Sequence, residues 1–148
     1  MSKSLLQPFA VIYPLPTHLA SRILQDKKSI FVKYPTHETI SPKLTSCKKL
    51  MLYISGANKE IAGEADIKSI SLMTLSETIL KYGSNLFLTE DELRKYSNGR
   101  DSKKMMVFEL DEITSYPAPK ALGHGITMVG EYISKEEYNL LVNKGDLI

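Results

Sequence analysis

The segment at residues 16–34, PTHLASRILQDKKSIFVKY, carries the pattern that decides the fold. In its first half, Leu19 and Ile23 are four residues apart and share one face of a helix predicted over Thr17–Gln25. The second half, Ser29–Tyr34, is rich in β-branched and aromatic residues and predicts a strand. The chain is therefore expected to run from a short helix through a basic turn into a strand.

Further strands are predicted on both sides of this segment. The compact apolar or alternating runs are Phe9–Tyr13, Lys49–Ile54, Glu60–Met73, Lys104–Leu110 and Gly125–Ile133. Residues 35–47 contain two prolines and several hydroxyl residues, and they predict an irregular loop. Pro117 and Pro119 are expected to break the chain after Tyr116, because proline donates no hydrogen bond to a strand ladder.

Helices are predicted where a hydroxyl residue stands just before a helical segment. The expected caps are Thr17, Ser76 before Glu77–Tyr82, Thr89 with Glu92, and Ser134 with Glu137. The resulting order of elements has too many consecutive strands for a doubly wound sheet. It favours an α+β fold, a small, mostly antiparallel β-barrel with flanking helices. No linker or repeat is visible, so residues 1–148 are expected to form a single domain.

Charge is distributed unevenly along the chain. The 148 residues carry a net charge of +2, with 43% hydrophobic and 24% charged residues, which excludes a disordered, collagen-like or membrane protein. Residues 1–50 hold eight basic and two acidic residues, whereas residues 51–148 hold eleven basic and fifteen acidic ones. The net charge is therefore +6 for residues 1–50 and −4 for residues 51–148. This asymmetry points to an anionic partner at one region of the surface.

Redox, targeting and metal signals are few. The single cysteine, Cys47, allows no internal disulfide, and its thiol is either a reactive thiolate beside two lysines or a small packing residue. Neither a signal peptide nor a membrane span is visible, so a cytoplasmic protein is expected. His18, His37 and His124 lack zinc-site spacing. No metal or other cofactor is therefore predicted, and the oligomeric state stays open.

The most informative local feature is a cluster of basic residues around the first helix. Its members are Arg22, Lys27, Lys28, Lys33, Lys48 and Lys49. The period of a strand places Lys33 on the same face as Phe31, with Tyr34 opposite. Cations mixed with aromatic rings suit phosphate neutralisation combined with base stacking. A solvated positive face is the alternative interpretation of the same residues.

The quoted segment resembles the opening signature of the ASCH domains, members of the PUA-like superfamily. Pro16 matches a proline at the helix start, Lys28 matches a lysine, and Lys33 stands in for an arginine. Asp26 replaces a glycine, and Phe31 replaces a glutamate. The later stretches KLMLYISGANKEIAGEADIKSI, LTEDELRKYSNGR and MMVFEL follow in the family's order, so the resemblance covers roughly residues 9–133. The likeness is greatest to an archaeal branch with no assigned activity.

This resemblance implies a PUA-like barrel with a cleft beside the first helix that binds RNA or modified nucleotides. Backbone N–H groups at the helix start suit an anion, lysines suit phosphate, and an aromatic ring suits a base. The predicted nucleic-acid-binding residues are Pro16, Thr17, His18, Arg22, Lys27, Lys28, Phe31, Lys33 and Tyr34. Arg94, Tyr96 and Arg100 form either a second edge of the cleft or a capped helix end at the surface.

Two other classes of function remain open. Some small proteins that this chain resembles are amidohydrolases that act on acylated cytidine through a lysine, a hydroxyl residue and a glutamate. The analogous residues are Lys28, Ser29 and Glu64, although Glu64 also fits a surface position on a strand. A protein-interaction module would follow if the acidic second half of the chain formed the binding surface.

Overall fold

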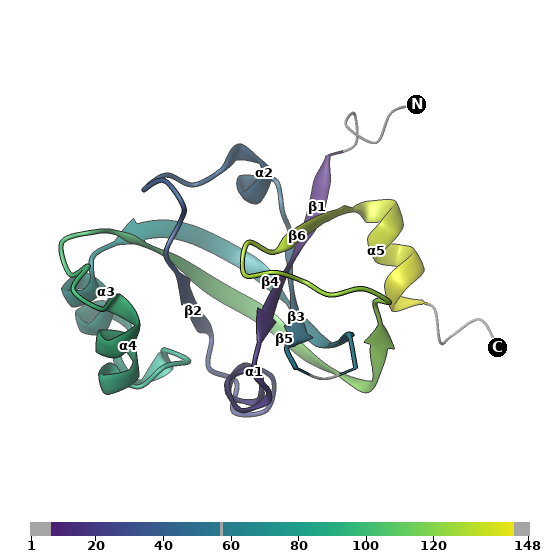
Figure 1. Cartoon of the computed structure of the whole chain (residues 1–148), viewed down its shortest axis with the longest axis horizontal. Helices are drawn as coiled ribbons and strands as arrows, with labels where there is room; N and C mark the ends of the chain where they lie inside the picture. The colour runs from purple at the N-terminus through teal and green to yellow at the C-terminus, as the bar shows by residue number, and fades with distance from the viewer. Residues whose placement is uncertain (1–6, 57, 144–148) are drawn as a thin grey trace.

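The fold is built on one six-stranded sheet with helices packed on both faces, as Figure 1 shows for the computed structural model. Residues 7–56 and 58–143 are described. The strands are β1 (Pro8–Leu15), β2 (Ile30–Lys33), β3 (Lys49–Ile54), β4 (Glu60–Met73), β5 (Met105–Ala121) and β6 (Glu131–Ser134). The helices are α1 (Thr17–Leu24), α2 (Pro42–Thr45), α3 (Leu75–Tyr82), α4 (Glu90–Ser97) and α5 (Lys135–Val142), with the 3-10 turn η2 (Gly83–Asn85). None of the helices in these two ranges has the length and apolar character needed to cross a membrane.

The sheet has the strand order β2-β5-β4-β3-β1-β6, and β1 with β3 is its one parallel pair among the described strands. The α+β class and the mostly antiparallel pairing are confirmed. The closed barrel is wrong, because the edge strands β2 and β6 do not pair with each other within the described ranges. Both edge strands are only four residues long. Side chains fill the space between β1 and β2 instead, where the rings of Tyr13 and Phe31 stack with their centroids 5.8 Å apart.

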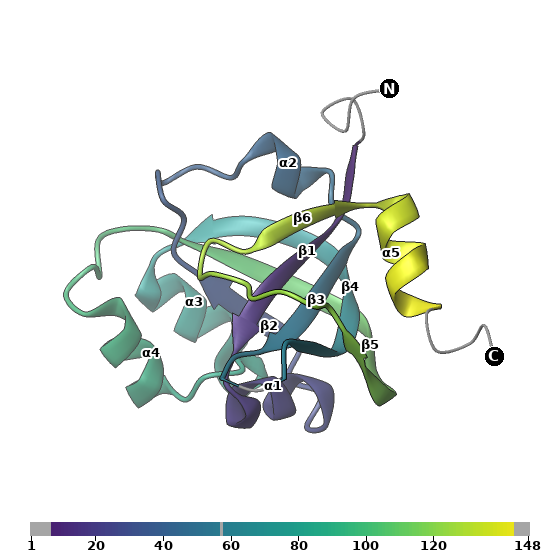
Figure 2. The same ribbon diagram turned by 45° about the vertical axis from the view of Figure 1, so that its right-hand side comes forward.

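Two cores cover the two faces of this curled sheet. The larger core holds the buried side of α1, with Ala20, Ile23 and Leu24, packed on strands β1 to β5. The smaller core lies between the other face and α5, where Tyr138 and Leu141 pack against buried residues of β1, β3 and β6. Figure 2 separates the two, with α5 on one side of the sheet and α1 below it. Every site residue can therefore be assigned to the α1 face or to the α5 face.

Helix α1 begins as a continuation of β1. Pro16 occupies the N-cap position, and its carbonyl oxygen accepts the N–H groups of Leu19 and Ala20 at 3.1 and 3.0 Å. The prediction that Thr17 caps this helix is wrong, since Thr17 is already its first helical residue. At its other end the helix lies close to β4, because a Cβ on Gly63 would come within 2.5 Å of a Leu24 methyl group. Glycine at this position thus permits the close packing of α1 on the sheet.

Strand β5 is the element whose length differs most from the sequence prediction. The sequence predicts an end at Leu110, but the strand continues past both prolines to Ala121. Its pairing with β4 shifts register between the pairs Gly63–Ser115 and Ile61–Lys120, so the prolines fall inside an irregular stretch. At this register shift the pairing of β4 with β5 requires no N–H donor from Pro117 or Pro119. Long-range pairing with β4 therefore extends the strand beyond the point at which the local sequence predicts a break.

Smaller boundary differences follow from local capping. Thr74 caps α3 in a capping box with Glu77, so the predicted cap Ser76 lies inside the helix. The predicted loop at 35–47 contains the single turn α2, and β6 begins only at Glu131. The boxes of Thr89 with Glu92 and of Ser134 with Glu137 are confirmed.

Candidate functional site

A hollow of about 370 Å³ opens beside the start of α1. It lies between α1, the ends of β1 and β2, and α4. Its wall is mainly apolar and aromatic, and its charged lining residues are Lys33, Lys95 and Glu92. Its lining includes Pro16, His18, Leu19, Phe87, Lys95 and Tyr96. The resemblance placed a cleft at this helix, and the structure has a cavity there.

A second hollow, of about 530 Å³, adjoins the first along the chain that follows β2. Its lining is richer in hydroxyl groups and includes Tyr34, Thr36, His37, Thr39, Ser41 and Tyr132. The two hollows share three lining residues, Tyr13, Lys33 and Met128. They are therefore two chambers of one depression, called the β1–β2 groove below: the apolar chamber beside α1 and the hydroxyl chamber beside residues 34–41.

Lys33 stands where the two chambers meet. Its side chain is half-buried, and its ammonium nitrogen lies 5.1 Å from the centroid of the Tyr13 ring. Burial lowers the pKa of this ammonium group. No carboxylate within the described ranges forms an ion pair with it. An unpaired, partly desolvated cation at the mouth of two chambers is a suitable partner for an anion.

The aromatic residues predicted at the groove have different roles. Phe31 is only 3% exposed, and its ring contacts those of Tyr13, Phe87 and Phe108 at centroid distances of 5.0 to 5.8 Å. The curl of the sheet buries most of this ring in the larger core, although Phe31 also belongs to the lining of the apolar chamber, so stacking of Phe31 on a base stays a prediction. The position at which the resemblance expects a glutamate is filled here by a residue of the larger core.

Tyr34 is half-buried beneath another side chain. The guanidinium of Arg100 lies 3.9 Å from its ring centroid, and its backbone N–H donates to the Tyr96 hydroxyl at 3.0 Å. Of the three residues considered for a second edge, Tyr96 lines the apolar chamber and Arg100 covers Tyr34. Arg94 instead pairs with Glu90 on its own helix. The α4 end therefore supports the groove from one side.

Three of the predicted basic residues lie outside the β1–β2 groove. Arg22 forms a two-pronged ion pair with Glu92, at 2.5 and 3.1 Å. The ammonium groups of Lys27 and Lys28 donate to backbone carbonyl oxygens, of Ile113 at 3.1 Å and Ser84 at 2.7 Å. Arg22 and Lys28 line a separate hollow of about 550 Å³ toward η2 and α4. The structure therefore brings only Pro16, His18, Phe31, Lys33 and Tyr34 of the predicted set to the groove, and Thr17 is exposed outside its lining.

The residues of the amidohydrolase alternative are not brought together. Glu64 pairs in register with Met51, a residue of the smaller core, so its side chain lies on the α5 face. Lys28 follows α1 and bonds to Ser84 on the opposite side of the sheet. Ser29 stays with Lys28, where its carbonyl oxygen accepts the N–H of Leu110. The structure therefore places Glu64 on a different face of the sheet from Lys28 and Ser29.

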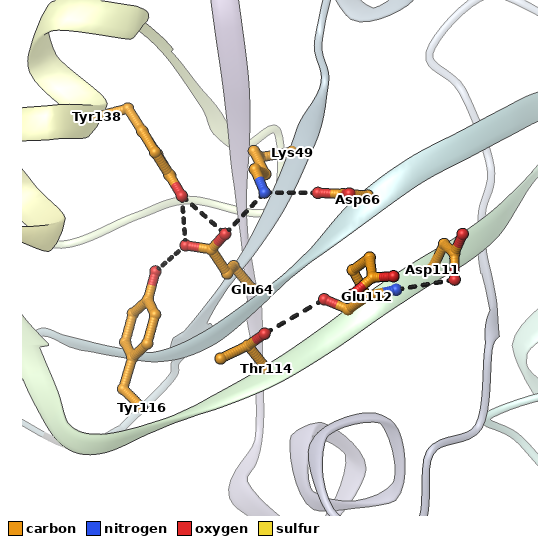
Figure 3. A network of polar contacts seen from close by, with 8 residues as sticks. All are labelled: Lys49, Glu64, Asp66, Asp111, Glu112, Thr114, Tyr116 and Tyr138. Atoms are coloured by element: carbon orange, nitrogen blue, oxygen red, sulfur yellow. Dashed lines mark hydrogen bonds and ion pairs between the residues drawn. The ribbon is translucent and has the colours of Figure 1, made fainter.

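Glu64 is instead the centre of a polar network, shown in Figure 3. It is 8% exposed, so the surface position considered above is wrong. Its carboxylate accepts the hydroxyls of Tyr116 at 2.6 Å and Tyr138 at 2.7 Å, and Lys49 lies 3.2 Å away. Burial and the hydrogen bond to Glu64 raise the pKa of both tyrosines. The network joins β3, β4, β5 and α5, so it links helix α5 to the sheet.

Sequence reasoning missed the residues that the long connection 122–130 brings to the groove. Met128 lines both chambers although it lies in a segment predicted as a strand. Lys95 and Tyr132 also line the groove, from α4 and β6. No local signal marks these residues, because their position depends on how the connection crosses β1. Among the described residues, no group of three His, Cys, Asp or Glu side chains is placed to hold a metal ion.

Comparison with known proteins places the chain in a family. A family model described as "Domain of unknown function (DUF365)" matches residues 8–135. The chain belongs to the DUF365 family. An "Uncharacterized protein MJECS03" of Methanocaldococcus jannaschii is 34% identical over 106 residues, which cover 65% of this DUF365 chain and 98% of the relative.

Solved structures with a similar fold include ASCH proteins. A serine-to-alanine mutant of ZmASCH from Zymomonas mobilis has a TM-score of 0.77 at 20% identity and covers 95% of the DUF365 chain and 99% of its own. The structure titled ASCH from the same organism has a TM-score of 0.71 at 21% identity, over 90% and 94% of the two chains. The N-terminal domain of Staphylothermus marinus McrB reaches 0.55 at 17% identity, over 98% and 99%. The DUF365 chain therefore shares the ASCH fold, as the sequence resemblance implied.

Proposed function

We propose that this DUF365 protein is a PUA-like module that binds single-stranded RNA or a nucleotide in the β1–β2 groove. The observation that carries the proposal is the half-buried ammonium of Lys33, which faces the groove without a carboxylate partner among the described residues. A phosphate group would supply the missing negative charge. Such a contact is stronger in a partly desolvated site than on an open surface.

The walls of the groove support the same ligand class. The apolar chamber offers the ring of Tyr96 together with Leu19 and Pro16, which suits the flat face of a base. His18 and Lys95 at its edge are exposed and add basic groups near Lys33. The fold shared with ASCH proteins and the resemblance of the segment at residues 16–34 support the assignment to the PUA-like modules. The balanced net charge of +2 favours recognition by a shaped groove over general attraction of polyanions.

The test is the salt dependence of binding to a short, fluorescently labelled, single-stranded oligoribonucleotide. We expect the affinity of the unmodified protein to fall as salt rises, because phosphate contacts release counterions. Lys33→Met is expected to bind more weakly, and the slope of log affinity against log salt should become shallower by about 0.7, the value for one phosphate contact on a single strand.

Two control variants remove the same charge elsewhere. Lys28→Met acts near α1 but outside the groove, and Lys68→Met acts at an exposed position on β4. Both should retain most of the affinity and the original slope. An equal loss of affinity in all three variants would show that each lysine acts only through the overall positive charge of the protein. That result would overturn the Lys33 contact. Affinity that does not change with salt would overturn nucleic-acid binding by this groove.

A further inference from the structure

The two chambers of the β1–β2 groove share a boundary that the proposed function does not use. Each chamber, at about 370 and 530 Å³, has the volume of a site for one small ligand. Tyr13, Lys33 and Met128 belong to both. The ammonium of Lys33 therefore stands between two ligand-sized spaces, whereas a site for one nucleotide would have its cation at one end.

The chambers differ in chemistry. The apolar chamber is bounded by Leu15, Leu19 and the Tyr96 ring, so it suits a base. The hydroxyl chamber is lined by Thr36, Thr39 and Ser41, all exposed, and by Tyr132. Hydroxyl side chains donate and accept hydrogen bonds, which suits the hydroxyls of a ribose. One chamber thus favours stacking, and the other favours sugar recognition.

Met128 lines both chambers, and the backbone around it fixes its position. It belongs to a tight turn in which the N–H of Gly130 donates to the carbonyl oxygen of Thr127 at 2.8 Å. Gly130 has a φ of +84°, and a Cβ there would lie 2.6 Å from the Tyr13 ring and 2.8 Å from the Ile12 carbonyl oxygen. Only glycine lets the turn lie this close to β1, and Figure 2 shows the connection crossing in front of that strand.

The turn presents an apolar tip to solvent. Met128 is 67% exposed and Val129 is 77% exposed, two of the largest exposures of a hydrophobic side chain among the described residues. A flexible thioether held beside two chambers can pack against a base on either side. The backbone therefore holds an exposed apolar side chain beside the one cation that both chambers share.

We infer, on the basis of the proposed function, that the groove binds two consecutive nucleotides of single-stranded RNA. One base lies in the apolar chamber, the linking phosphate contacts Lys33, and the next nucleotide lies in the hydroxyl chamber with Met128 between the two. The recognised unit is then a dinucleotide step, and a free mononucleotide fills only half of the site.

The test compares the dinucleoside monophosphates ApA, ApU, UpA and UpU with AMP and UMP by calorimetry on the full chain. The ribodinucleotide that binds best should bind roughly tenfold to a hundredfold more tightly than either mononucleotide, because the second nucleotide adds the packing of its base on Met128 and its sugar contacts in the hydroxyl chamber. The deoxy form of that dinucleotide should bind more weakly. A deoxy form that binds equally well would overturn the assignment to RNA.

Variants of Met128 and of its turn separate the inference from general damage. Met128→Ser should weaken dinucleotide binding by a larger factor than mononucleotide binding, and so remove most of the dinucleotide advantage. Gly130→Ala should have the same effect by displacing the turn, whereas Gly123→Ala, at φ +87° in the same connection with no atom within 4 Å of its Cβ, should retain the advantage. An unchanged advantage in Met128→Ser would show that Met128 does not lie between the two nucleotides.

The possible failures are distinguishable. Binding of AMP or UMP that depends on Lys33, without any gain for a dinucleotide, would overturn this inference and leave the proposed function standing. No Lys33-dependent binding of any mononucleotide, dinucleotide or longer oligoribonucleotide would overturn both.

Discussion

The ammonium nitrogen of Lys33 lies 5.1 Å from the centroid of the Tyr13 ring, and this contact joins two strands that share no backbone pairing. Tyr13 belongs to β1 and Lys33 ends β2, and the open side of the curled sheet lies between them. Closing the barrel would pair the edge strands β2 and β6 by hydrogen bonds. Because the sheet stays open, side chains line the gap and leave the groove in which we place the ligand.

The ion pair between Arg22 and Glu92 is predicted to stabilise the fold in a pH-dependent way. Glu92 also caps α4 by accepting the N–H of Thr89, and the hydrogen bonds from Arg22 and Thr89 lower its pKa to about 2. Since the carboxyl pKa is lowered in the folded state, its contribution is present above pH 4.5 and is lost as the pH falls toward 2. After allowance for solvent screening at this partly exposed pair, Glu92→Gln should lower the free energy of unfolding by about 1 kcal/mol at pH 7.

Denaturant unfolding at pH 7 and pH 2 measures this contribution. The difference between the unmodified protein and Glu92→Gln should shrink markedly at the lower pH. Glu90→Gln is the matched control, because Glu90 forms an exposed pair with Arg94 on the same helix. An equal difference at both pH values would contradict the role assigned to the Glu92 charge.

The network around Glu64 is predicted to stabilise the docking of α5 without affecting RNA binding. Tyr138→Phe removes a hydroxyl that donates to the buried carboxylate at 2.7 Å, and it should lower the free energy of unfolding by about 1–3 kcal/mol. Because the network lies on the face opposite the groove's helix α1, affinity for the oligoribonucleotide should stay unchanged.

Tyr82→Phe on α3 serves as the control for loss of a tyrosine hydroxyl. Equilibrium unfolding and the anisotropy assay give the two readouts. A Tyr138→Phe variant as stable as the unmodified protein would contradict the link between α5 and the sheet. Loss of RNA affinity in a fully folded Tyr138→Phe protein would show that RNA binds on the α5 face and would contradict the groove beside α1.

Cys47 is predicted to be unreactive in the folded protein. Its side chain is 5% exposed, its thiol donates to the Lys43 carbonyl oxygen at 3.4 Å, and burial raises its pKa to about 12. The alternative of a reactive thiolate beside Lys48 and Lys49 is therefore wrong, and the packing role holds. At pH 8 an aromatic disulfide reagent should modify the thiol only as fast as the protein unfolds.

The control for this prediction is the same protein in denaturant, which should react immediately. Fast modification under native conditions, at a rate independent of added denaturant, would show an accessible thiolate at Cys47.

Local signals predicted the elements that local interactions determine. The capping boxes at Thr89 and Ser134 are short-range hydrogen-bond patterns, so four residues of sequence suffice to identify them. The alternating run Glu60–Met73 likewise matches β4 residue for residue. The full length of β5 was not predictable from the same signals, because its pairing with β4 overrides the two prolines at a register shift.

The groove was predictable only in part, for a related reason. Lys33 was identified from its charge and its place at the end of a strand. The curl of the sheet then decides that Phe31, two residues earlier, lies in the core, while Lys33 lies at the opening. Nearness in sequence predicts that Arg22 and Lys28 act together with Lys33, but their partners Glu92 and Ser84 are distant in sequence. Contacts of that range leave no local pattern.

The most direct test of a Lys33 phosphate contact is the pKa of its own ammonium group, followed by NMR in the protein labelled at lysine, with Lys33→Arg used to assign the signal. In the free protein, burial should hold this pKa below that of an ordinary lysine. Saturation with the best-binding ribodinucleotide should raise the pKa, because the phosphate favours the charged form. A pKa that stays the same in the free and saturated protein would contradict the contact and, with it, the account of the groove.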